Sequence, residues 1–170
     1  MNDIQLNDQS FMAEAYAEAL AGYQQGGVPV GAVMVKEGEV LFRGRNKRVQ
    51  EGDPVMHGET DCLRNAGMVD DYSDLVLYTT LSPCMMCTGA ILHFGIRRVV
   101  VGEDVNFPGN IDFLRANGVE VVLLDDEPCK RLMARFIEER PDIWFEDIAG
   151  NDEAQTSLAC RTTASTCNHS

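Results

Sequence analysis

Long stretches of positive charge are missing from this sequence, which has no run of five or more Lys or Arg residues. Its 14 Lys and Arg residues stand against 27 Asp and Glu residues, which gives a formal net charge of −13. A surface this negative repels the phosphate backbone of nucleic acids. We therefore predict a small neutral or cationic partner and no nucleic-acid partner, although net charge alone does not exclude a local tRNA site.

A secretory signal and long hydrophobic runs are also missing. The N-terminal segment MNDIQLNDQS is polar and acidic and has neither the basic nor the apolar region of a signal peptide. No apolar run approaches the roughly 18 residues that a membrane span requires. We expect a soluble, cytoplasmic protein without a membrane partner. In that reducing compartment its six cysteines would bind a metal or carry out redox chemistry more readily than form disulfides.

The hydrophobic periodicity predicts an α/β fold in a single domain. Apolar strand-like segments span residues 28–35, 40–46, 75–81, 97–102 and 119–124, and helical patterns span residues 10–25, 57–67, 84–94, 111–117 and 129–140. The first two strands form a hairpin. After it strands alternate with helices, which favours a largely parallel sheet covered by helices on both faces.

Local signals set the expected ends of these elements. Ser10 and Ser82 are candidate N-caps, Pro83 suits a first helical turn, and Pro141 should end the last long helix. An aromatic and acidic segment, residues 142–148, follows. We assign residues 1–150 to one domain and residues 151–170, which are rich in Ser, Thr, Asn and Ala, to a polar tail.

Two short motifs carry the chemistry. HGE contains His57 and Glu59, and SPCMMC contains Cys84 and Cys87. Each motif alone is weak, but both together are a strong signal. Residues three apart on a helix share a face, and a helix start favours the thiolate form of cysteine. Two sulfurs and one nitrogen suit Zn²⁺, and three protein ligands leave a fourth position for water.

Two other interpretations of the cysteine pair remain open. A structural zinc site would need a fourth ligand, and His93 points away from both cysteines at 100° per helical residue. A thioredoxin-like dithiol would leave His57 and Glu59 unexplained. Glu59 lies two residues from His57, so it can approach the metal without binding it and act as general base and then general acid. The alternative for Glu59 is a solvated glutamate at a helix start.

These motifs resemble the signature of the zinc-dependent nucleobase and nucleoside deaminases. The resemblance extends through GGVPVGAV, RGRN, LYTTLSPCMMCTGAI, VGEDVNF and ERPDIWFEDI to the small cytosine deaminases of the fungal type, over approximately residues 8–150. It implies a three-layer α/β/α sandwich around a five-stranded mixed sheet, the cytidine deaminase-like fold. It also implies a homodimer and a role in pyrimidine salvage, with hydrolysis of cytosine to uracil and ammonia.

The resemblance also implies a role for each site residue. His57, Cys84 and Cys87 would bind one Zn²⁺ per subunit, and Glu59 would carry the proton while zinc hydroxide attacks C4 of the base. The remaining residues would contact the base: Asn46 and Asp147 at its polar edge, Phe107 and Trp144 around the ring, and Ser82 and the Gly58 backbone through polar contacts.

From the residues alone, Phe107 and Trp144 could equally be core side chains, and Asn46 and Asp147 a turn residue and a surface carboxylate. Two positions depart from the fungal pattern: Met85 stands where we expect an acidic residue, and Met56 where we expect leucine. If they border the pocket, substrate preference could differ.

Three rival functions remain. The closest rival is deamination of isocytosine, guanine or a related aminoheterocycle. A second is deamination of adenosine in tRNA, which the net charge of −13 disfavours. The third is an inactive zinc-binding protein, which the presence of Glu59 disfavours.

Overall fold

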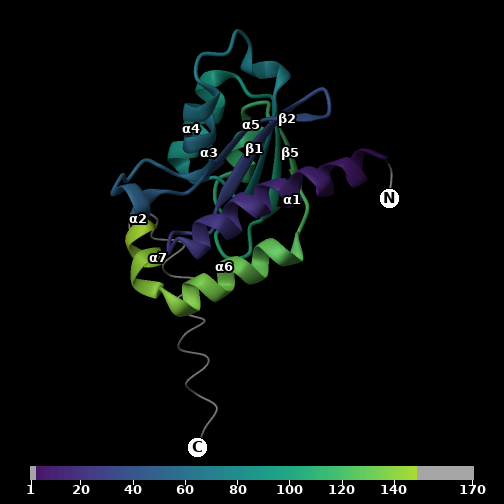
Figure 1. Ribbon diagram of the computed structural model, residues 1–170. Coiled ribbons are helices and arrows are strands. Elements are labelled where there is room, and N and C mark those ends of the chain that lie inside the picture. Colours follow the sequence, from purple (N-terminus) through teal and green to yellow (C-terminus); the bar gives the residue numbers. More distant parts are fainter. Residues whose placement is uncertain (1–2, 149–170) are drawn as a thin grey trace, which may run out of the picture.

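The computed structural model describes the backbone of residues 3–148 and the side chains from residue 7 onward. It contains one five-stranded sheet in the order β2-β1-β3-β4-β5 (Figure 1). The strands are β1 (Gly31–Lys36), β2 (Glu39–Arg45), β3 (Val76–Leu81), β4 (Arg98–Glu103) and β5 (Glu120–Leu123). β1 runs antiparallel to β2 and β3, whereas β3, β4 and β5 are parallel. The predicted mixed sheet is confirmed.

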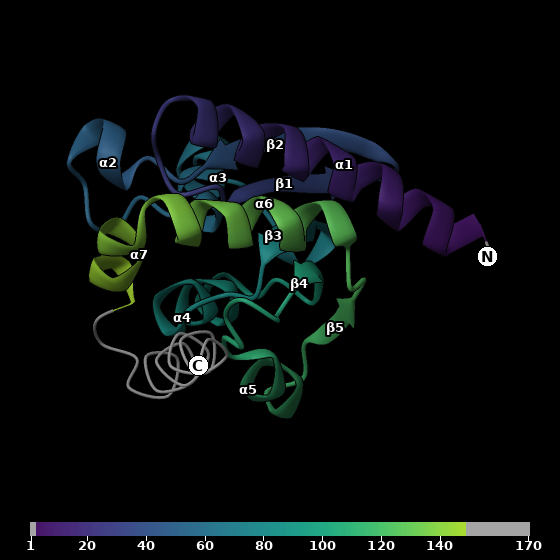
Figure 2. The ribbon, with the colours of Figure 1, turned by 90° about the horizontal axis from the view of Figure 1, so that it is seen from below.

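The helices form a layer on each face of the sheet (Figure 2). The helices are α1 (Asp3–Gln24), α2 (Arg48–Glu51), α3 (Gly58–Ala66), α4 (Met85–Phe94), α5 (Ile111–Ala116), α6 (Glu127–Glu139) and α7 (Pro141–Asp147). Helices α1 and α6 cover one face, and α3, α4 and α5 cover the other. This arrangement is the predicted three-layer α/β/α sandwich.

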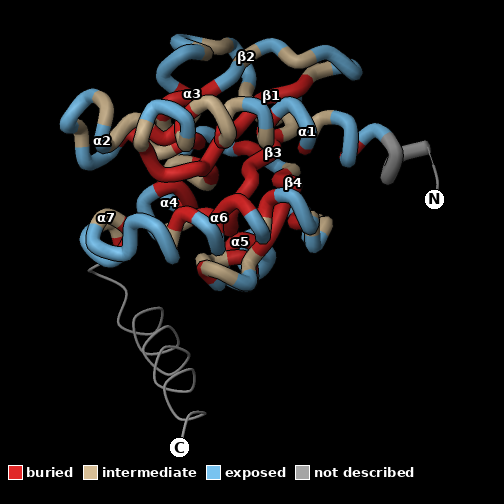
Figure 3. Tube along the Cα trace, turned by 60° about the horizontal axis from the view of Figure 1, so that its bottom comes forward, coloured by how far each residue is buried: buried red, intermediate tan, exposed pale blue. Residues whose placement is uncertain are grey.

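Alternating strand residues build the two halves of the core. Leu77 and Val99 pack with Cys62 of α3 and Ile91 of α4. Their strand neighbours Tyr78 and Val100 point the other way and pack with Met12 and Cys129, from α1 and α6. This follows from the period of two along a strand. Buried residues accordingly lie between the helical layers, and the outer faces of the helices are exposed (Figure 3).

One glycine allows helix α3 to lie directly on the sheet. A Cβ atom at Gly44 of β2 would lie only 2.2 Å from the backbone nitrogen of Cys62. The missing side chain therefore lets α3, which begins next to the predicted metal-binding histidine, pack closely on β2.

Four chain segments meet at one edge of the sheet. The parallel strands β3 and β4 end at this edge, β2 also ends there, and the antiparallel strand β1 begins there. The carboxyl edge of parallel strands is where ligands bind in open α/β sheets. The predicted site residues follow or precede these strand ends.

Several local predictions were wrong. Helix α1 begins before Ser10, and the N-cap of α4 is Cys84 rather than Ser82. The Ser82 hydroxyl instead donates a hydrogen bond to the carbonyl oxygen of Pro108, at 2.9 Å. Two short helices, α2 and α7, lie in segments where the sequence predicted none. Tertiary contacts overrode the local capping signal.

Within the described residues, no helix combines the length and the apolar character that crossing a membrane requires. The predicted tail, residues 151–170, lies outside the part of the chain that the structure describes.

Candidate active site

The predicted metal ligands meet where two helices begin. His57 is the N-cap of α3, Cys84 is the N-cap of α4, and Cys87 lies in the first turn of α4. Their candidate ligand atoms all lie within 4.8 Å of one another. The Thr60 hydroxyl accepts a hydrogen bond from the His57 backbone N–H at 2.8 Å, which fixes the start of α3.

This donor set fits a tetrahedral zinc ion. The Nδ1 atom of His57 lies 3.5 Å from Sγ of Cys84. A tetrahedral ion with ordinary Zn–N and Zn–S bonds separates such atoms by about 3.6 Å. The other ring nitrogen of His57, Nε2, lies 3.2 Å from Oδ1 of Asp147. A carboxylate on the second nitrogen is the usual partner of a metal-binding histidine, because it sets the tautomer and orientation of the ring.

The electrostatics of the cluster favour a thiolate. Hydrogen bonding from the Cys87 thiol, opposed by burial and aided by His57, lowers the pKa of Cys84 to about 4. The same hydrogen bond raises the pKa of Cys87, and burial adds to that effect. Burial lowers the pKa of His57, but the carboxylate of Asp147 and the sulfur of Cys84 outweigh burial and raise it. Metals bind the thiolate form, so Cys84 is prepared as a ligand.

Glu59 lies beside the cluster in the first turn of α3. Its side chain is buried, with 3% of the residue surface exposed. One carboxyl oxygen, Oε1, lies 3.1 Å from the Thr79 hydroxyl, and the other, Oε2, lies 3.4 Å from Sγ of Cys87. Burial raises the pKa of this carboxyl group, and the negative charge of Cys84 adds to the effect. A buried carboxyl group with a raised pKa holds a proton more readily than a solvated one, which suits a group that takes up a proton and then delivers it.

A cavity opens over Glu59 and the cluster. The predicted residues that line it are Asn46, His57, Glu59, Ser82, Cys84, Phe107, Trp144 and Asp147, and the further lining residues are Val30, Leu81 and Ile148. The rings of Phe107 and Trp144 meet edge to face, with centroids 6.0 Å apart and planes at 88°. Both are almost fully buried. The cavity thus combines an apolar wall with a few convergent polar groups, as small-molecule sites do.

The loop that carries Phe107 is held by a buried carboxylate. Glu103, at the end of β4, accepts hydrogen bonds from the backbone N–H groups of Val105 and Asn106, at 2.7 and 2.9 Å. The loop is also tied to the strand-end residue Ser82 through its bond to Pro108. These contacts fix the aromatic wall of the cavity.

Asn46 presents a defined group to the cavity. Its Oδ1 atom accepts a hydrogen bond from the backbone N–H of Arg48 at 3.1 Å. The amide NH₂ group is therefore the part that remains for a ligand. Asn46 is 1% exposed, and its backbone N–H is bonded to the carbonyl oxygen of Val30 at 2.8 Å.

The sequence of this chain also matches known proteins. The family described as "Cytidine and deoxycytidylate deaminase zinc-binding region" matches residues 5–103. The chain belongs to this deaminase family. A cytosine deaminase of Candida albicans (strain SC5314 / ATCC MYA-2876) is 48% identical over 145 residues, which cover 84% of this chain and 97% of that protein. A tRNA-specific adenosine deaminase of Streptococcus pyogenes serotype M1 is 36% identical over 107 residues, 61% of this chain and 63% of the relative.

Solved structures of deaminases share the fold. A chain from a study of A-to-I editing by tRNA:A34 deaminases has a TM-score of 0.64 at 27% identity and covers 73% of this chain and 99% of that one. A guanine deaminase from Bacillus subtilis has a TM-score of 0.54 at 30% identity, and the match covers 71% of this chain and 73% of that one. Family membership and the His57, Cys84 and Cys87 cluster confirm the predicted zinc cofactor.

Of the residues predicted to contact the base in this deaminase, Gly58 is the one that does not line the cavity. It lies between His57 and Glu59 at the start of α3, packed against Val30: a Cβ atom there would lie 3.0 Å from the Val30 carbonyl oxygen. Of the departures from the fungal pattern, Met85 is 53% exposed near the cavity mouth and Met56 is buried.

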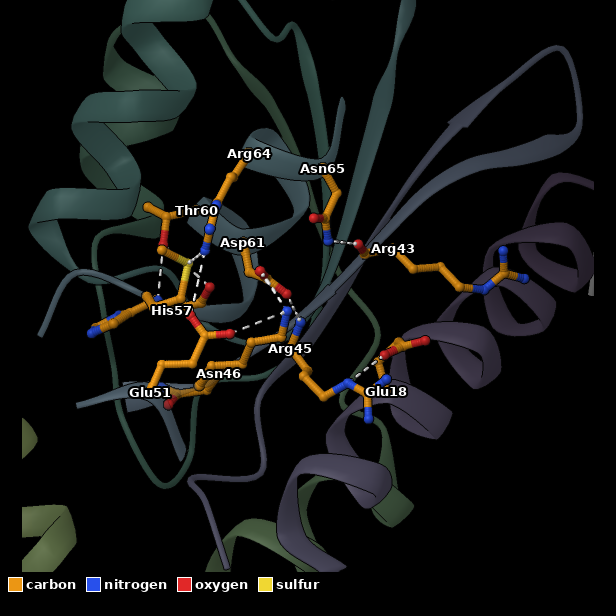
Figure 4. A network of polar contacts seen from close by, with 12 residues as sticks. Glu18, Arg43, Arg45, Asn46, Glu51, His57, Thr60, Asp61, Arg64 and Asn65 are labelled. Carbon is orange, nitrogen blue, oxygen red and sulfur yellow. Dashed lines mark hydrogen bonds and ion pairs between the residues drawn. The ribbon is translucent and has the colours of Figure 1, made fainter. Parts of the chain in front are cut away.

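The sequence did not identify three residues that support the deaminase site. Arg48 pairs with Asp147 at 3.3 Å and with Glu146 at 3.2 Å, and so joins α2 to α7. Asp61 of α3 is 1% exposed and accepts hydrogen bonds from the residues on either side of Asn46 (Figure 4). These bonds come from the Arg45 backbone N–H at 3.0 Å and the Lys47 ammonium group at 2.9 Å.

The third missed residue is Thr79, and its sequence signal was present. Thr79 and its neighbour Thr80 interrupt a largely apolar strand that leads into the SPCMMC motif. A polar residue in a strand buried on both faces needs a hydrogen-bond partner. Arg48 and Asp61, in contrast, have no such signal, because charged residues near loops are usually solvated.

Proposed function

We propose that this chain is a zinc-dependent hydrolase that converts cytosine to uracil and ammonia. The similarity to the Candida albicans cytosine deaminase supports it, because the match runs through nearly the whole of both the described chain and the relative. The observation that carries the proposal is the position of α7: Trp144, Asp147 and the following Ile148 line the cavity that lies over Glu59 and His57. A free base fits a site covered by the protein's own chain better than a base within a long polymer does.

The residues of the site divide the reaction between them. Zinc held by His57, Cys84 and Cys87 would supply an activated water and a positive charge at the carbon under attack. Glu59 would accept one proton of the attacking water and deliver it to the ring nitrogen N3, and would then carry the second proton from the new hydroxyl group at the attacked carbon to the leaving amine. Its burial beside Thr79 keeps it within reach of the cavity without making it a metal ligand.

The base would be recognised at its polar edge and at its faces. The Asn46 amide NH₂ donates to the pyrimidine carbonyl oxygen, and the Asp147 carboxylate accepts from an N–H group of the base. Ser82 and the Gly58 backbone add polar contacts at the strand end and helix start. Phe107 and Trp144 enclose the ring, exclude water and thereby strengthen these polar contacts.

The test is ammonia release from zinc-loaded protein with cytosine, isocytosine, guanine, cytidine and adenosine, beside a chelator-treated control. We expect chelator-sensitive turnover of cytosine well above that of the other compounds. Preference for guanine or isocytosine would mean that the base contacts are misassigned, and the cavity residues Asn46, Phe107 and Asp147 would be the first positions to change. Turnover of adenosine in tRNA, with binding that weakens as salt rises, would replace the proposal with the rival suggested by the Streptococcus pyogenes relative.

We propose further that two copies form a homodimer through the exposed first turn of α4. Met85 and Met86 are adjacent large apolar residues there, 53% and 37% exposed in the isolated chain. An exposed apolar patch is typical of interfaces. Sedimentation equilibrium of the wild type and of a Met86→Lys variant tests this assignment, and a wild-type monomer at micromolar concentration would refute it.

The remaining assignments follow from the same chemistry. We propose one deaminase domain over residues 1–150, a polar tail over residues 151–170, and a cytoplasmic location. The four described cysteines are free thiols, and two of them are metal ligands that must stay reduced. Removal of residues 151–170 should leave zinc content and kcat unchanged, and a loss of either would place the tail within the functional domain.

A further inference from the structure

Thr79 contributes a buried hydroxyl group to which the proposed chemistry gives no role. It lies near the end of β3, is 0% exposed, and points to the same face as Leu77, toward α3. Its Oγ1 atom lies 3.1 Å from Oε1 of Glu59 and 3.2 Å from the carbonyl oxygen of Leu81. The hydroxyl is thus placed between the proposed proton carrier and the backbone that leads to the metal-binding helix.

Packing does not explain a hydroxyl at this position. Apart from Tyr78, Thr79 and Thr80, β3 is an apolar central strand, and all of its residues after Val76 are buried. Valine has nearly the shape of threonine and would fill the same space. A hydroxyl group costs free energy when it is buried unless hydrogen bonds replace its contacts with water. The group therefore has to be explained by its two hydrogen-bond partners.

The chemistry of a hydroxyl suits a partner that carries a proton. A hydroxyl has one hydrogen to donate and two lone pairs that accept. It can donate to Oε1 of a Glu59 carboxylate. It can equally accept from a Glu59 carboxylic acid and donate its own hydrogen to the Leu81 carbonyl oxygen. The same positions of Glu59 and Thr79 therefore keep the hydroxyl and Oε1 hydrogen-bonded to each other in both cases.

We propose that Thr79 is a positioning residue for the reaction, whose hydroxyl holds Oε1 of Glu59 and so fixes the plane of the carboxyl group. The second oxygen, Oε2, is then directed to the side of the cluster, where it lies 3.4 Å from Sγ of Cys87. The rate of proton transfer depends steeply on the orientation of the carboxyl group. A hydrogen bond to one oxygen keeps the other oxygen in the orientation that the transfer requires. This inference rests on the proposed function.

The test compares four variants of the zinc-loaded, full-length protein by zinc content, melting temperature and steady-state kinetics with cytosine. Thr79→Val removes the hydroxyl and keeps the shape, and Thr79→Ser restores the hydroxyl. Thr79→Ala removes the hydroxyl with less steric demand, in case the valine variant does not fold. Thr80→Val is the matched control: its hydroxyl accepts a hydrogen bond from the Gly31 backbone N–H at 3.1 Å, on the other face of the same strand.

We expect Thr79→Val to keep one zinc ion per chain and to lower kcat by about 10- to 100-fold, with KM within about twofold of wild type. Thr79→Ser should recover kcat to within about threefold of wild type, because the donor and acceptor return. Thr80→Val should lose stability but keep kcat. A purely structural hydrogen bond would lower the melting temperature of both valine variants alike and leave both kcat values unchanged.

Two outcomes would overturn the inference: a Thr79→Val kcat within about twofold of wild type, or an equal fall of kcat in Thr80→Val. A crystal structure of Thr79→Val adds a readout independent of activity, since an unmoved and fully ordered Glu59 carboxyl group would also contradict it. If wild type turns over a different base of the panel, the same comparison is made with that base. A wild type that deaminates nothing in the panel refutes the proposed function itself, and the inference with it.

Discussion

The metal ligands stand at the starts of α3 and α4, two helices that pack on the sheet, whereas Trp144 and Asp147 stand on α7, a seven-residue helix outside the sheet layers. We call the part of the site that carries the metal ligands the ligand side. Backbone structure holds it in place, through the strand ends, the helix starts and the close packing of α3 at Gly44. We call α7, which lies over the cavity, the cover, and its part of the site the covering side. Side chains hold it in place, chiefly through the Arg48 ion pairs and the packing of Trp144 on Phe107. The two sides should therefore respond differently to substitution.

The family match follows the same division. It extends over residues 5–103 and so includes the metal ligands, Glu59 and Asn46, but not Phe107, Trp144 or Asp147. The metal site and the proposed proton carrier thus lie within the matched residues, whereas three of the proposed base contacts lie beyond them.

The largest effect should follow removal of a metal ligand. Cys87→Ala should lose zinc, all activity above background, and the stability that zinc binding adds, roughly 3 kcal/mol when free zinc is 100-fold above its Kd. Zinc analysis, thermal unfolding and ammonia release measure these losses. Cys129→Ala is the matched control, a buried cysteine of α6 remote from the cluster. Zinc retained at full stoichiometry in Cys87→Ala would remove Cys87 from the ligand set.

Glu59→Gln, also on the ligand side, should abolish most of the turnover but leave metal binding intact. The amide keeps the size of the side chain but cannot carry the proton, so kcat should fall by about 10²- to 10⁴-fold while zinc content stays at one per chain. Steady-state kinetics and metal analysis on one preparation test this. Activity within about tenfold of wild type would show that another group moves the proton.

Arg48→Met should weaken the attachment of α7 and leave zinc binding unchanged. Loss of the guanidinium group leaves Asp147 without one of its two partners and releases Glu146. We expect KM to rise about tenfold with unchanged zinc content, and faster amide hydrogen exchange in α7. Arg131→Met, on the exposed face of α6, is the control, since isolated surface pairs contribute little. Equal kinetics and exchange in both variants would mean that α7 is held by apolar packing alone.

Asp61→Asn should have the smallest effect, because it alters the support of Asn46 indirectly. Asparagine can still accept from the Arg45 N–H group but no longer pairs as a charge with Lys47. We expect KM to rise about threefold and stability to fall by about 1.5 to 3 kcal/mol. A double-mutant cycle with Lys47→Met tests the pair directly. Additive effects in that cycle would show that the two residues act separately.

The two sides also differ in how far the sequence predicts their residues. His57, Cys84 and Cys87 could be predicted because ligand spacing is local and helix starts are marked in the sequence. Ser82 was misassigned as a cap because its hydroxyl bonds to Pro108, 26 residues later, a contact that no local pattern encodes.

The covering side could not be derived from the residues alone. Helix α7 is short, Arg48 and Asp61 look like ordinary charged surface residues, and their partners lie 14 to 99 positions away. The roles of Asn46 and Asp147 came from resemblance, and the structure adds the contacts that orient them. Thr79 carried an unused signal, which it shares with Thr80: both are polar residues in a buried strand.

Arg140 both ends α6 and begins α7, so a single residue joins the cover to the rest of the enzyme. A junction this short, placed after the last strand, allows other terminal helices to be grafted after residue 140 without changing any strand, provided that they fill the core positions of Trp144 and Ile148. A library of such grafts would vary which amine is hydrolysed while the hydrolytic machinery stayed constant.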